Sequence, residues 1–552
     1  MTTIPSKNSV RLTRAVMLFV LAVSMIVRYR VLIGENKPYE NTWLFVLCGI
    51  FMLYSFITNR AVPHFFAVDA ACLLPSAILC ISTYAGFFYN SPGLNAFPVN
   101  LIIIVLTFLA WYVFFCCIRA FRVRFITCPC DERKLSFSQR LLFVLGCAIV
   151  LAVTYRCFWP YLQSPDTKNQ WMQIHGELAY NSIHAIGHTI FLKALLSIWD
   201  SYTFVVLIQL IGLIAVNMAF AEFFYSKGIR FDVIAFVQLL SLIWLSADTI
   251  ALFAPWKDSP AALCMAVVVL TMMKHPQPEK MSCSAAAWLG LALVWCALFR
   301  INGIIVLIVC GLYFLFKFFH ARAGRKIAAF LIPIILSWAF VSCYSTYVLH
   351  TEKPENGFSI QVFGSGIAAA VKDGNLSDEE LAAVDELLPV SWMEETYSGP
   401  ASKRNLIWAS DGSPRIANDK ELEIFNNEFV LRLGEQKAEV IRLYLKLLPH
   451  HFVVMLKDAL GSAAMTWRIG TTFFVSNYIF SFCLILFYVL RYRLSFGEML
   501  VFLPTLCNTF SIIISTITNE TRYLLPTFIM TPFYILYILW RGKLRESSAS
   551  LK

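Results

Sequence analysis

Apolar runs of about 20 residues recur along the whole chain, separated by short polar or charged stretches. A helix of that length crosses a hydrocarbon core of about 30 Å, since each residue advances it by about 1.5 Å. The pattern therefore predicts an all-α polytopic membrane protein with about 14 transmembrane helices. The predicted spans lie near residues 15–34, 42–58, 65–88, 98–117, 139–158, 202–225, 232–254, 259–273, 286–299, 303–320, 326–349, 472–490, 496–517 and 521–540.

Composition agrees with this interpretation. Hydrophobic residues make up 59% of the 552 positions, charged residues make up 14%, and the mean hydropathy is +0.67. Such values exclude an ordinary soluble domain, and they make the lipid bilayer the first expected partner. The formal net charge of +11 is interpreted as basic residues gathered in cytoplasmic loops, so no nucleic-acid partner is expected. Most of the 16 cysteines lie inside apolar runs, where they act as small hydrophobic residues.

Basic residues give a predicted orientation. The loop from Arg119 to Arg140 is rich in Arg and Lys, so the positive-inside rule assigns it to the cytoplasm. Alternation from this loop puts the other basic clusters and both termini on the same side. The first apolar run lacks a small-residue cleavage site and is interpreted as an anchor. We therefore expect a multi-pass protein of the cell membrane with both termini in the cytoplasm.

Four regions follow from this topology. Residues 1–138 hold N-terminal membrane helices and a basic cytoplasmic loop, 139–349 a membrane core, 350–471 a polar extracytoplasmic insert, and 472–552 C-terminal helices and a cytoplasmic tail. The insert is predicted to be mainly helical. Ser377 and Glu380 form a capping box that opens a helix from Asp378 to Leu388, and a second helical pattern runs from about Asp419 to Leu448.

The outer side also receives a polar stretch that starts at Ser164. Ser164 is a natural N-cap, Pro165 suits the first helical position, and Asp166 would lie in the first turn, where the helix dipole favours a carboxylate. One helix face would then carry Asp166, Gln170, Gln173 and Glu177. Two interpretations stay open: a polar face that holds a charged substrate, or an ordinary amphipathic helix on the membrane surface.

Histidines follow this stretch. His184 and His188 are four residues apart, so they could share a helix face and ligate a metal ion. Ala185 follows His184, so the HExxH pattern is absent. Hydrogen bonds that orient the Asp166 loop are therefore the favoured role for the pair.

Further charged residues lie at outer ends of spans. Asp248, Lys257 and Asp258 are ionisable groups at a depth where charge is expensive, which favours a function. A structural pair of Lys257 with either acid is equally open. Arg300 and Arg522 suit a lipid phosphate, or else extend to the head groups as anchors.

The order of these motifs resembles the loops of GT-C-type membrane glycosyltransferases, in an uncharacterised bacterial branch of that superfamily. The resemblance covers roughly residues 140–540 and implies a GT-C-like core at residues 139–349. It rests on Ser164–Thr167, Gln170-Trp171, Tyr180-Asn181, His184 and His188-Thr189 in the first loop, and on Trp256–Asp258, Phe299–Gly303 and Arg522-Tyr523 in later loops. The spans before the Asp166 loop and the position of the insert between spans depart from the best-known relatives.

The resemblance implies an enzyme that passes a sugar from a polyprenyl-phosphate donor to an extracytoplasmic glycan or polymer acceptor. Asp166 is then the expected catalytic base, and Lys257, Arg300 and Arg522 would hold the lipid phosphate. The other residues expected to contact substrate are Gln170, His175, His184, His188, Asn302 and Tyr523. Some relatives use a divalent metal ion such as Mg or Mn, for which Asp248 or Asp258 would be the second-loop ligand here.

Two other functions compete with the glycosyltransferase. A transporter or flippase for a lipid-linked saccharide also suits many spans. The lack of an internal repeat and the gathering of ionisable residues on one face argue against it. A non-catalytic scaffold with an external binding domain is the third interpretation, and it leaves that gathering unexplained.

Overall fold

The computed structural model describes residues 69–90, 104–105, 108–109, 111–116, 133–162, 165–182, 184–248, 250–352, 361–387, 390–396, 435–462, 478–515 and 521–550. Within these ranges the chain is helical, and the β contact there is an isolated parallel bridge between Asn181 and Glu352. The predicted spans at 15–34 and 42–58 lie outside the described residues, as does half of the span at 98–117.

Six described segments are long and apolar enough to cross a membrane. They are Phe137–Arg156, Tyr202–Ser226, Gly303–His320, Gly324–Val348, Phe496–Ile513 and Arg522–Gly542. Shorter apolar helices are Ala70–Ser82, Ile186–Leu196, Phe231–Ile243, Cys283–Phe299 and Tyr478–Tyr492. The structure thus confirms an all-helical chain, over the residues it describes, with several helices suited to a bilayer. The count of about 14 crossings stays a prediction, because some predicted spans form helices below the usual length of about 20 residues.

The membrane part consists of many helices and a few short turns. Before the insert they are α4 (Ala70–Asn90), α6 (Phe137–Arg156), α7 (Pro165–Ile174), α8 (Ile186–Leu196), α9 (Tyr202–Ser226), α10 (Phe231–Asp248), η1 (Ile250–Phe253), α11 (Asp258–Lys274), η2 (Pro278–Lys280), α12 (Cys283–Phe299), α13 (Gly303–His320), α14 (Gly324–Cys343) and η3 (Tyr344–Val348). After the insert they are α22 (Tyr478–Tyr492), α23 (Phe496–Met499), η7 (Leu500–Phe502), α24 (Leu503–Ser515), η8 (Thr521–Leu524) and α25 (Leu525–Ser550).

Local signals explain where several of these helices begin. The Ser136 hydroxyl accepts from the Gln139 backbone N–H at 3.3 Å, and the Gln139 side chain accepts from the Ser136 N–H at 2.9 Å. This capping box starts α6. Ser201 caps α9 by accepting from the Thr203 N–H at 3.2 Å. Each cap satisfies backbone donors that a helix start would otherwise leave without a partner.

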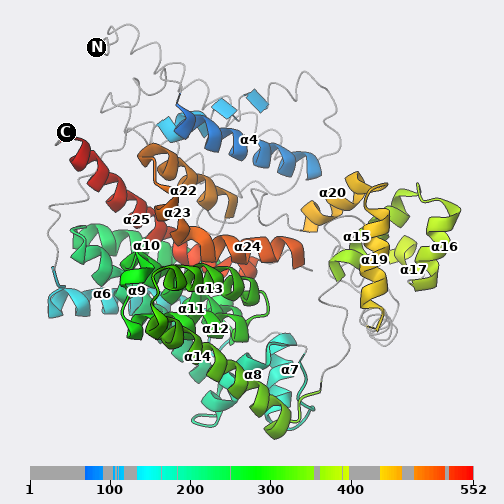
Figure 1. The fold of residues 1–552 in the computed structure, drawn as a ribbon, viewed down its shortest axis with the longest axis horizontal. Helices are drawn as coiled ribbons and strands as arrows, with labels where there is room; N and C mark the ends of the chain where they lie inside the picture. The colour runs from blue at the N-terminus through cyan, green and yellow to red at the C-terminus, as the bar shows by residue number, and fades with distance from the viewer. Residues whose placement is uncertain are drawn as a thin grey trace, which may run out of the picture.

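Helix α25 packs at the centre of the bundle, against α9, α10, α11 and α22 (Figure 1). The ring of Phe533 on α25 stacks on Phe220 of α9, with centroids 3.8 Å apart. Helices α12 and α14 approach closely at Gly290, where an added Cβ would overlap the carbonyl oxygen of Phe330. Such close contacts matter because, in lipid, helix association depends on tight packing more than on removal from water.

The insert forms a helical unit of its own. It contains α15 (Gln361–Asp373), α16 (Asp378–Leu387), α17 (Val390–Thr396), α19 (Lys437–Leu447) and α20 (Phe452–Ser462). Ile367, Val384, Val440 and Met455 are buried in its core. The predicted helix from Asp378 is confirmed as far as Leu387, the last residue that the structure describes there, and its capping box is present. Of the second predicted helix, the structure describes the part that forms α19.

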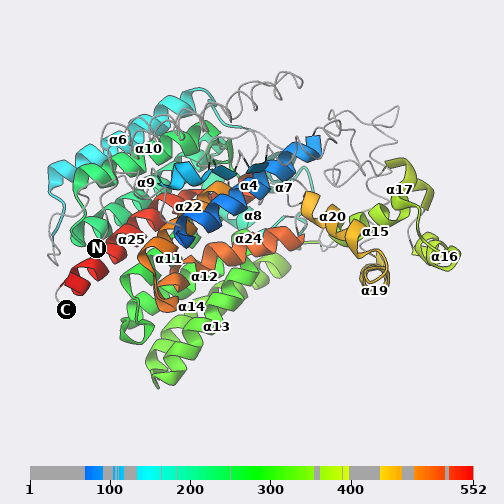
Figure 2. The same cartoon turned by 90° about the horizontal axis from the view of Figure 1, so that it is seen from above.

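The insert lies at one end of the bundle. Figure 1 and Figure 2 both show it beyond the C-terminal end of α24, at the opposite end from the last turns of α25. Helices α15 and α20 contact α24 directly. The large polar region of the chain is therefore joined to the end of the bundle at which α24 ends and α25 begins.

Candidate functional site

Helix α7 carries Asp166 in its first turn, as predicted. The predicted N-cap, Ser164, lies outside the described residues. Thr167 is buried, and its carbonyl oxygen accepts from the Tyr202 hydroxyl at 2.8 Å, which ties α7 to α9. Gln170 and Gln173 are also buried, and α7 ends before Glu177. The expected polar face thus packs inward, and the interpretation of α7 as an ordinary surface helix is wrong.

Asp166 is the centre of a charged cluster built from distant segments. Lys257 Nζ donates to Asp166 Oδ2 at 3.1 Å, and Arg522 Nη1 lies 3.6 Å from the same oxygen. Lys257 Nζ also lies 3.3 Å from Nδ1 of His184. The side chains of Asp166, Lys257 and Arg522 are 29%, 21% and 14% exposed, so solvent still reaches this cluster.

Aromatic rings support the cations of the cluster. The Arg522 guanidinium lies 4.5 Å from the ring centroid of Trp256 and 5.2 Å from that of Tyr523. A cation over a ring face is attracted by the ring quadrupole, and the planar guanidinium stacks well there. The sequence motifs contained all three residues, but the stacking of Arg522 on Trp256 joins positions too far apart in the chain to be predicted.

Asp258 and Arg300 form a separate pair. Arg300 Nη1 lies 2.8 Å from Asp258 Oδ1, with 7% and 0% of the two side chains exposed. Arg300 also donates to the backbone carbonyl of Tyr523 at 3.2 Å and lies 4.7 Å from the centroid of its ring. Lys257 pairs with Asp166, so the predicted alternative of a Lys257–Asp258 pair is wrong. The side chain of Asp248 is outside the described residues.

The two histidines have different roles. Helix α8 begins at Ile186, so His184 precedes it and the pair does not share a helix face. His188 is fully buried, and its Nδ1 lies 3.2 Å from Oε1 of Gln170. Gln170 in turn donates to the Thr189 hydroxyl at 2.9 Å. This network holds α7 against α8, which agrees with the prediction that histidines orient the Asp166 loop.

Charge and burial set the protonation of the cluster. Burial raises the pKa of Asp166, but Lys257, His184 and Arg522 together outweigh it and hold the pKa below its usual value. Burial and then Lys257 lower the pKa of His184 to about 4. At neutral pH Asp166 is therefore a carboxylate and His184 a neutral imidazole. Since Lys257 donates to Nδ1 of His184, the proton of that ring is on Nε2.

The remaining predicted substrate residues lie around this cluster or apart from it. Tyr523 lies beside both arginines, whereas Asn302 is at the start of α13 without a side-chain cap bond. His175 follows the other end of α7, where it stacks on Trp171 and contacts Asp200 at 3.0 Å. Nine residues of helix separate it from Asp166 by about 13 Å along the axis. His175 is therefore not brought into the cluster.

The described side chains do not fit the Mg or Mn ion that some GT-C enzymes use, and that of Asp248 is not among them. Among the described residues there is no group of three or more His, Cys, Asp and Glu side chains that could hold a metal ion. Asp258 faces a guanidinium, and Asp166 faces an ammonium and a guanidinium. Hard divalent ions require several oxygen ligands, and neighbouring cations oppose their binding.

The geometry joins residues of four segments, around 166, 184, 257 and 522, into one partly exposed charged site. Comparisons with protein-family models, curated proteins and solved structures find no match for the chain.

Proposed function

We propose that the chain is a membrane glycosyltransferase that moves a sugar from a polyprenyl-phosphate donor to an extracytoplasmic glycan or polymer acceptor. The observation that carries the proposal is the cluster of Asp166 with Lys257 and Arg522. It combines the two groups that this chemistry needs, a carboxylate to take a proton and cations to hold a phosphate leaving group. The resemblance of the sequence motifs to GT-C enzymes supports the same reaction.

In the proposed reaction the hydroxyl oxygen of the acceptor attacks the anomeric carbon of the donor. The bond from that carbon to the phosphate oxygen breaks, and the electron pair leaves with the polyprenyl phosphate. Lys257 and Arg522 stabilise the charge on this leaving group. Asp166 receives the hydroxyl proton as the new glycosidic bond forms.

Asp166 has a second role in the proposed reaction. In the structure its carboxylate pairs with the cations that the donor phosphate would contact. A bound phosphate would draw Lys257 and Arg522 away from Asp166. The pKa of Asp166 would then rise, because the charges that lower it have moved to another anion. Donor binding would in this way make the carboxylate a better base.

Arg300 has a supporting role in the proposal. Its guanidinium is engaged by Asp258 and by the carbonyl of Tyr523, the residue next to Arg522. This arrangement suits a residue that fixes the Tyr523 backbone and so the place of Arg522. It revises the sequence-based expectation that all three cations contact the donor.

Analysis of cell-envelope glycans tests the function. We expect a sugar substituent that is present with the intact chain to be missing without it and with Asp166→Asn in its place. Lipid-linked intermediates retained on the cytoplasmic side, with no effect of Asp166→Asn, would contradict the transferase and favour a flippase.

The proposal includes the orientation of the chain in the cell membrane, with both termini in the cytoplasm. It is tested by impermeant thiol labelling of a single Cys introduced into an otherwise Cys-free chain. A Cys at Ser398, in the insert, should react in intact cells. A Cys at Ser138, at the start of α6, should not react, and the reverse pattern would put the Asp166 cluster on the wrong side for this function.

A further inference from the structure

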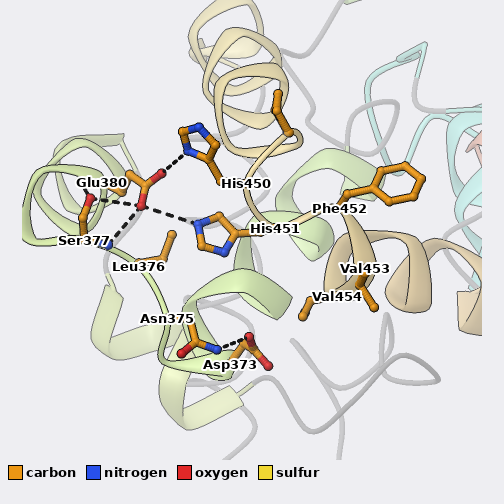
Figure 3. Close-up of a pocket in the computed structure, with 11 residues that line it drawn as sticks. Asp373, Asn375, Leu376, Ser377, Glu380, His450, His451, Phe452, Val453 and Val454 are labelled. Atoms are coloured by element: carbon orange, nitrogen blue, oxygen red, sulfur yellow. Dashed lines mark hydrogen bonds and ion pairs between the residues drawn. The ribbon is translucent and has the colours of Figure 1, made fainter.

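A polar cavity of about 630 Å³ lies in the insert, apart from the Asp166 cluster (Figure 3). Cavities of this size commonly hold small-molecule ligands. The α15–α16 connection forms one wall and the turn between α19 and α20 forms another. The polar residues that line it are Asp373, Asn375, Ser377, Glu380, His450 and His451.

Glu380 joins the two walls. Its carboxylate accepts from the backbone N–H and the hydroxyl of Ser377 at 2.9 and 3.0 Å. His450 Nδ1 and His451 Nε2 approach it at 3.1 and 3.4 Å, as Figure 3 shows. The bond from the Ser377 backbone and then the one from His450 lower the pKa of Glu380 to about 2. Glu380 is therefore ionised, and each histidine ring must donate a hydrogen bond to its carboxylate.

This arrangement decides what the cavity can bind. In a neutral imidazole whose other nitrogen donates to Glu380, the second nitrogen is an acceptor. Asn375 donates to Asp373 at 2.7 Å, and its own carbonyl oxygen is another acceptor. Among the described residues no Lys or Arg lines the cavity, so an anionic group is disfavoured. Both carboxylates of the cavity already accept hydrogen bonds, Glu380 from Ser377 and the two histidines and Asp373 from Asn375, and hydroxyl groups can donate to the lone pairs that remain. Uncharged hydroxyl groups fit these walls best.

The remaining side of the cavity is apolar. Phe452 and Val453 line it and are 52% and 62% exposed, and Leu456 continues the same helix face one turn later. Helix α20 contacts α24, which belongs to a candidate membrane span and exposes Phe510 and Ile513. Both views of the fold show α20 beside the C-terminal end of α24 (Figure 1 and Figure 2). The apolar side of the cavity thus continues the surface that α24 offers to lipid.

We propose that this cavity binds the head group of a glycolipid. The uncharged, hydroxyl-rich head donates hydrogen bonds to the polar walls, and the acyl chains stay in the bilayer beside Phe452 and Val453. The inference goes beyond the transfer reaction, and its test measures binding alone. An absence of transferase activity therefore leaves the result of this test unaffected.

Hydrogen–deuterium exchange of the full chain in lipid nanodiscs tests the proposal. The discs contain phosphatidylcholine alone, or phosphatidylcholine with diglucosyl-diacylglycerol or with phosphatidylglycerol, and a further sample receives free maltose. We expect slower exchange in residues 373–380 and 449–454 with the glycolipid only. The double variant with His450→Ala and Asn375→Ala should lose this protection, and both side chains are exposed, so the fold should persist. Lys446→Gln, on α19 but outside the cavity, should keep it.

Each other outcome contradicts the proposal in a defined way. Equal protection by phosphatidylglycerol, whose head group is anionic, would show that the cavity does not select an uncharged glycolipid head group. Equal protection by maltose would show that the ligand is a free saccharide rather than a lipid. Protection in none of the samples, or protection that survives the double variant, would show that the cavity does not bind a glycolipid.

Discussion

Replacement of Asp166 by Asn separates the two parts that this residue has in the proposed reaction. Asn keeps the shape of the side chain and its capping ability, but it has no charge and little basicity. In the structure the carboxylate lies 3.1 Å from Lys257 Nζ and 3.6 Å from Arg522 Nη1. A donor phosphate has to displace it from both cations, so its removal should help the phosphate to bind.

The size of the effect follows from the bonds that are exchanged. A hydrogen bond to a charged group contributes about 1.5–3 kcal/mol net. Asp166→Asn should therefore tighten the binding of sugar-free polyprenyl phosphate by about 10-fold to 100-fold. The same variant should lose turnover by at least about 100-fold, because the acceptor proton has no base to receive it. Tighter binding together with lost transfer distinguishes this reasoning from a general loss of structure.

The assay uses the full chain in lipid nanodiscs. Binding of a fluorescent polyprenyl phosphate is measured by polarisation, and transfer is measured with a labelled sugar donor. Asp232→Asn is the matched control, since Asp232 forms an exposed pair with Arg230 outside the cluster. It should change neither quantity. Near-normal transfer by Asp166→Asn would refute the base assignment, and unchanged or weaker phosphate binding would refute the displacement.

Three further outcomes are expected. Lys257→Ala and Arg522→Ala should each raise the donor KM by about 10-fold to 100-fold and leave the acceptor KM unchanged, which steady-state kinetics would measure. Arg300→Met should lower the free energy of unfolding by about 3–5 kcal/mol, because it leaves the buried Asp258 charge without its cation. The double variant with Asp258→Leu should regain part of this loss in thermal unfolding experiments. Stability should fall as the pH drops from about 6.5 to about 4, because His184 takes up a proton in that window in the unfolded chain but not in the folded protein. His184→Gln should make thermal unfolding less dependent on pH over this range without removing the dependence, because burial also lowers the pKa of His188, to about 3.

Helices with strong local signals could be predicted closely from the sequence. The predicted span at 303–320 has the bounds of α13, and that at 202–225 differs from α9 by one residue. Long apolar runs with polar ends fix such bounds by themselves. The predicted span at 232–254 differs more, since α10 ends at Asp248 and a short turn, η1, follows. An apolar composition does not show where a helix breaks when the following residues remain apolar.

The candidate site could be predicted as a set of residues but not as a set of contacts. Asp166, Lys257 and Arg522 were all named from local motifs, because each is ionisable and lies beside an apolar run. Their pairing depends on how α7 packs against the rest of the bundle, and the buried bond from Tyr202 to Thr167 fixes that packing. Contacts between segments 91 residues apart, as for Lys257 and Asp166, leave no local pattern in the sequence.

Two neighbouring residues show which charged pair suits a reaction. Lys257 and Asp258 are adjacent in the chain, yet they turn to different partners, because α11 starts between them. Asp258 and Arg300 are buried, so if either side chain moved to another partner, the other would remain as an unpaired buried charge. Lys257 and Arg522 share Asp166 where solvent enters, so an incoming anion can replace the carboxylate without leaving a charge unpaired. A scaffold would need only a buried pair such as Asp258 with Arg300. A reaction that releases a phosphate needs cations that can change partner, as Lys257 and Arg522 can.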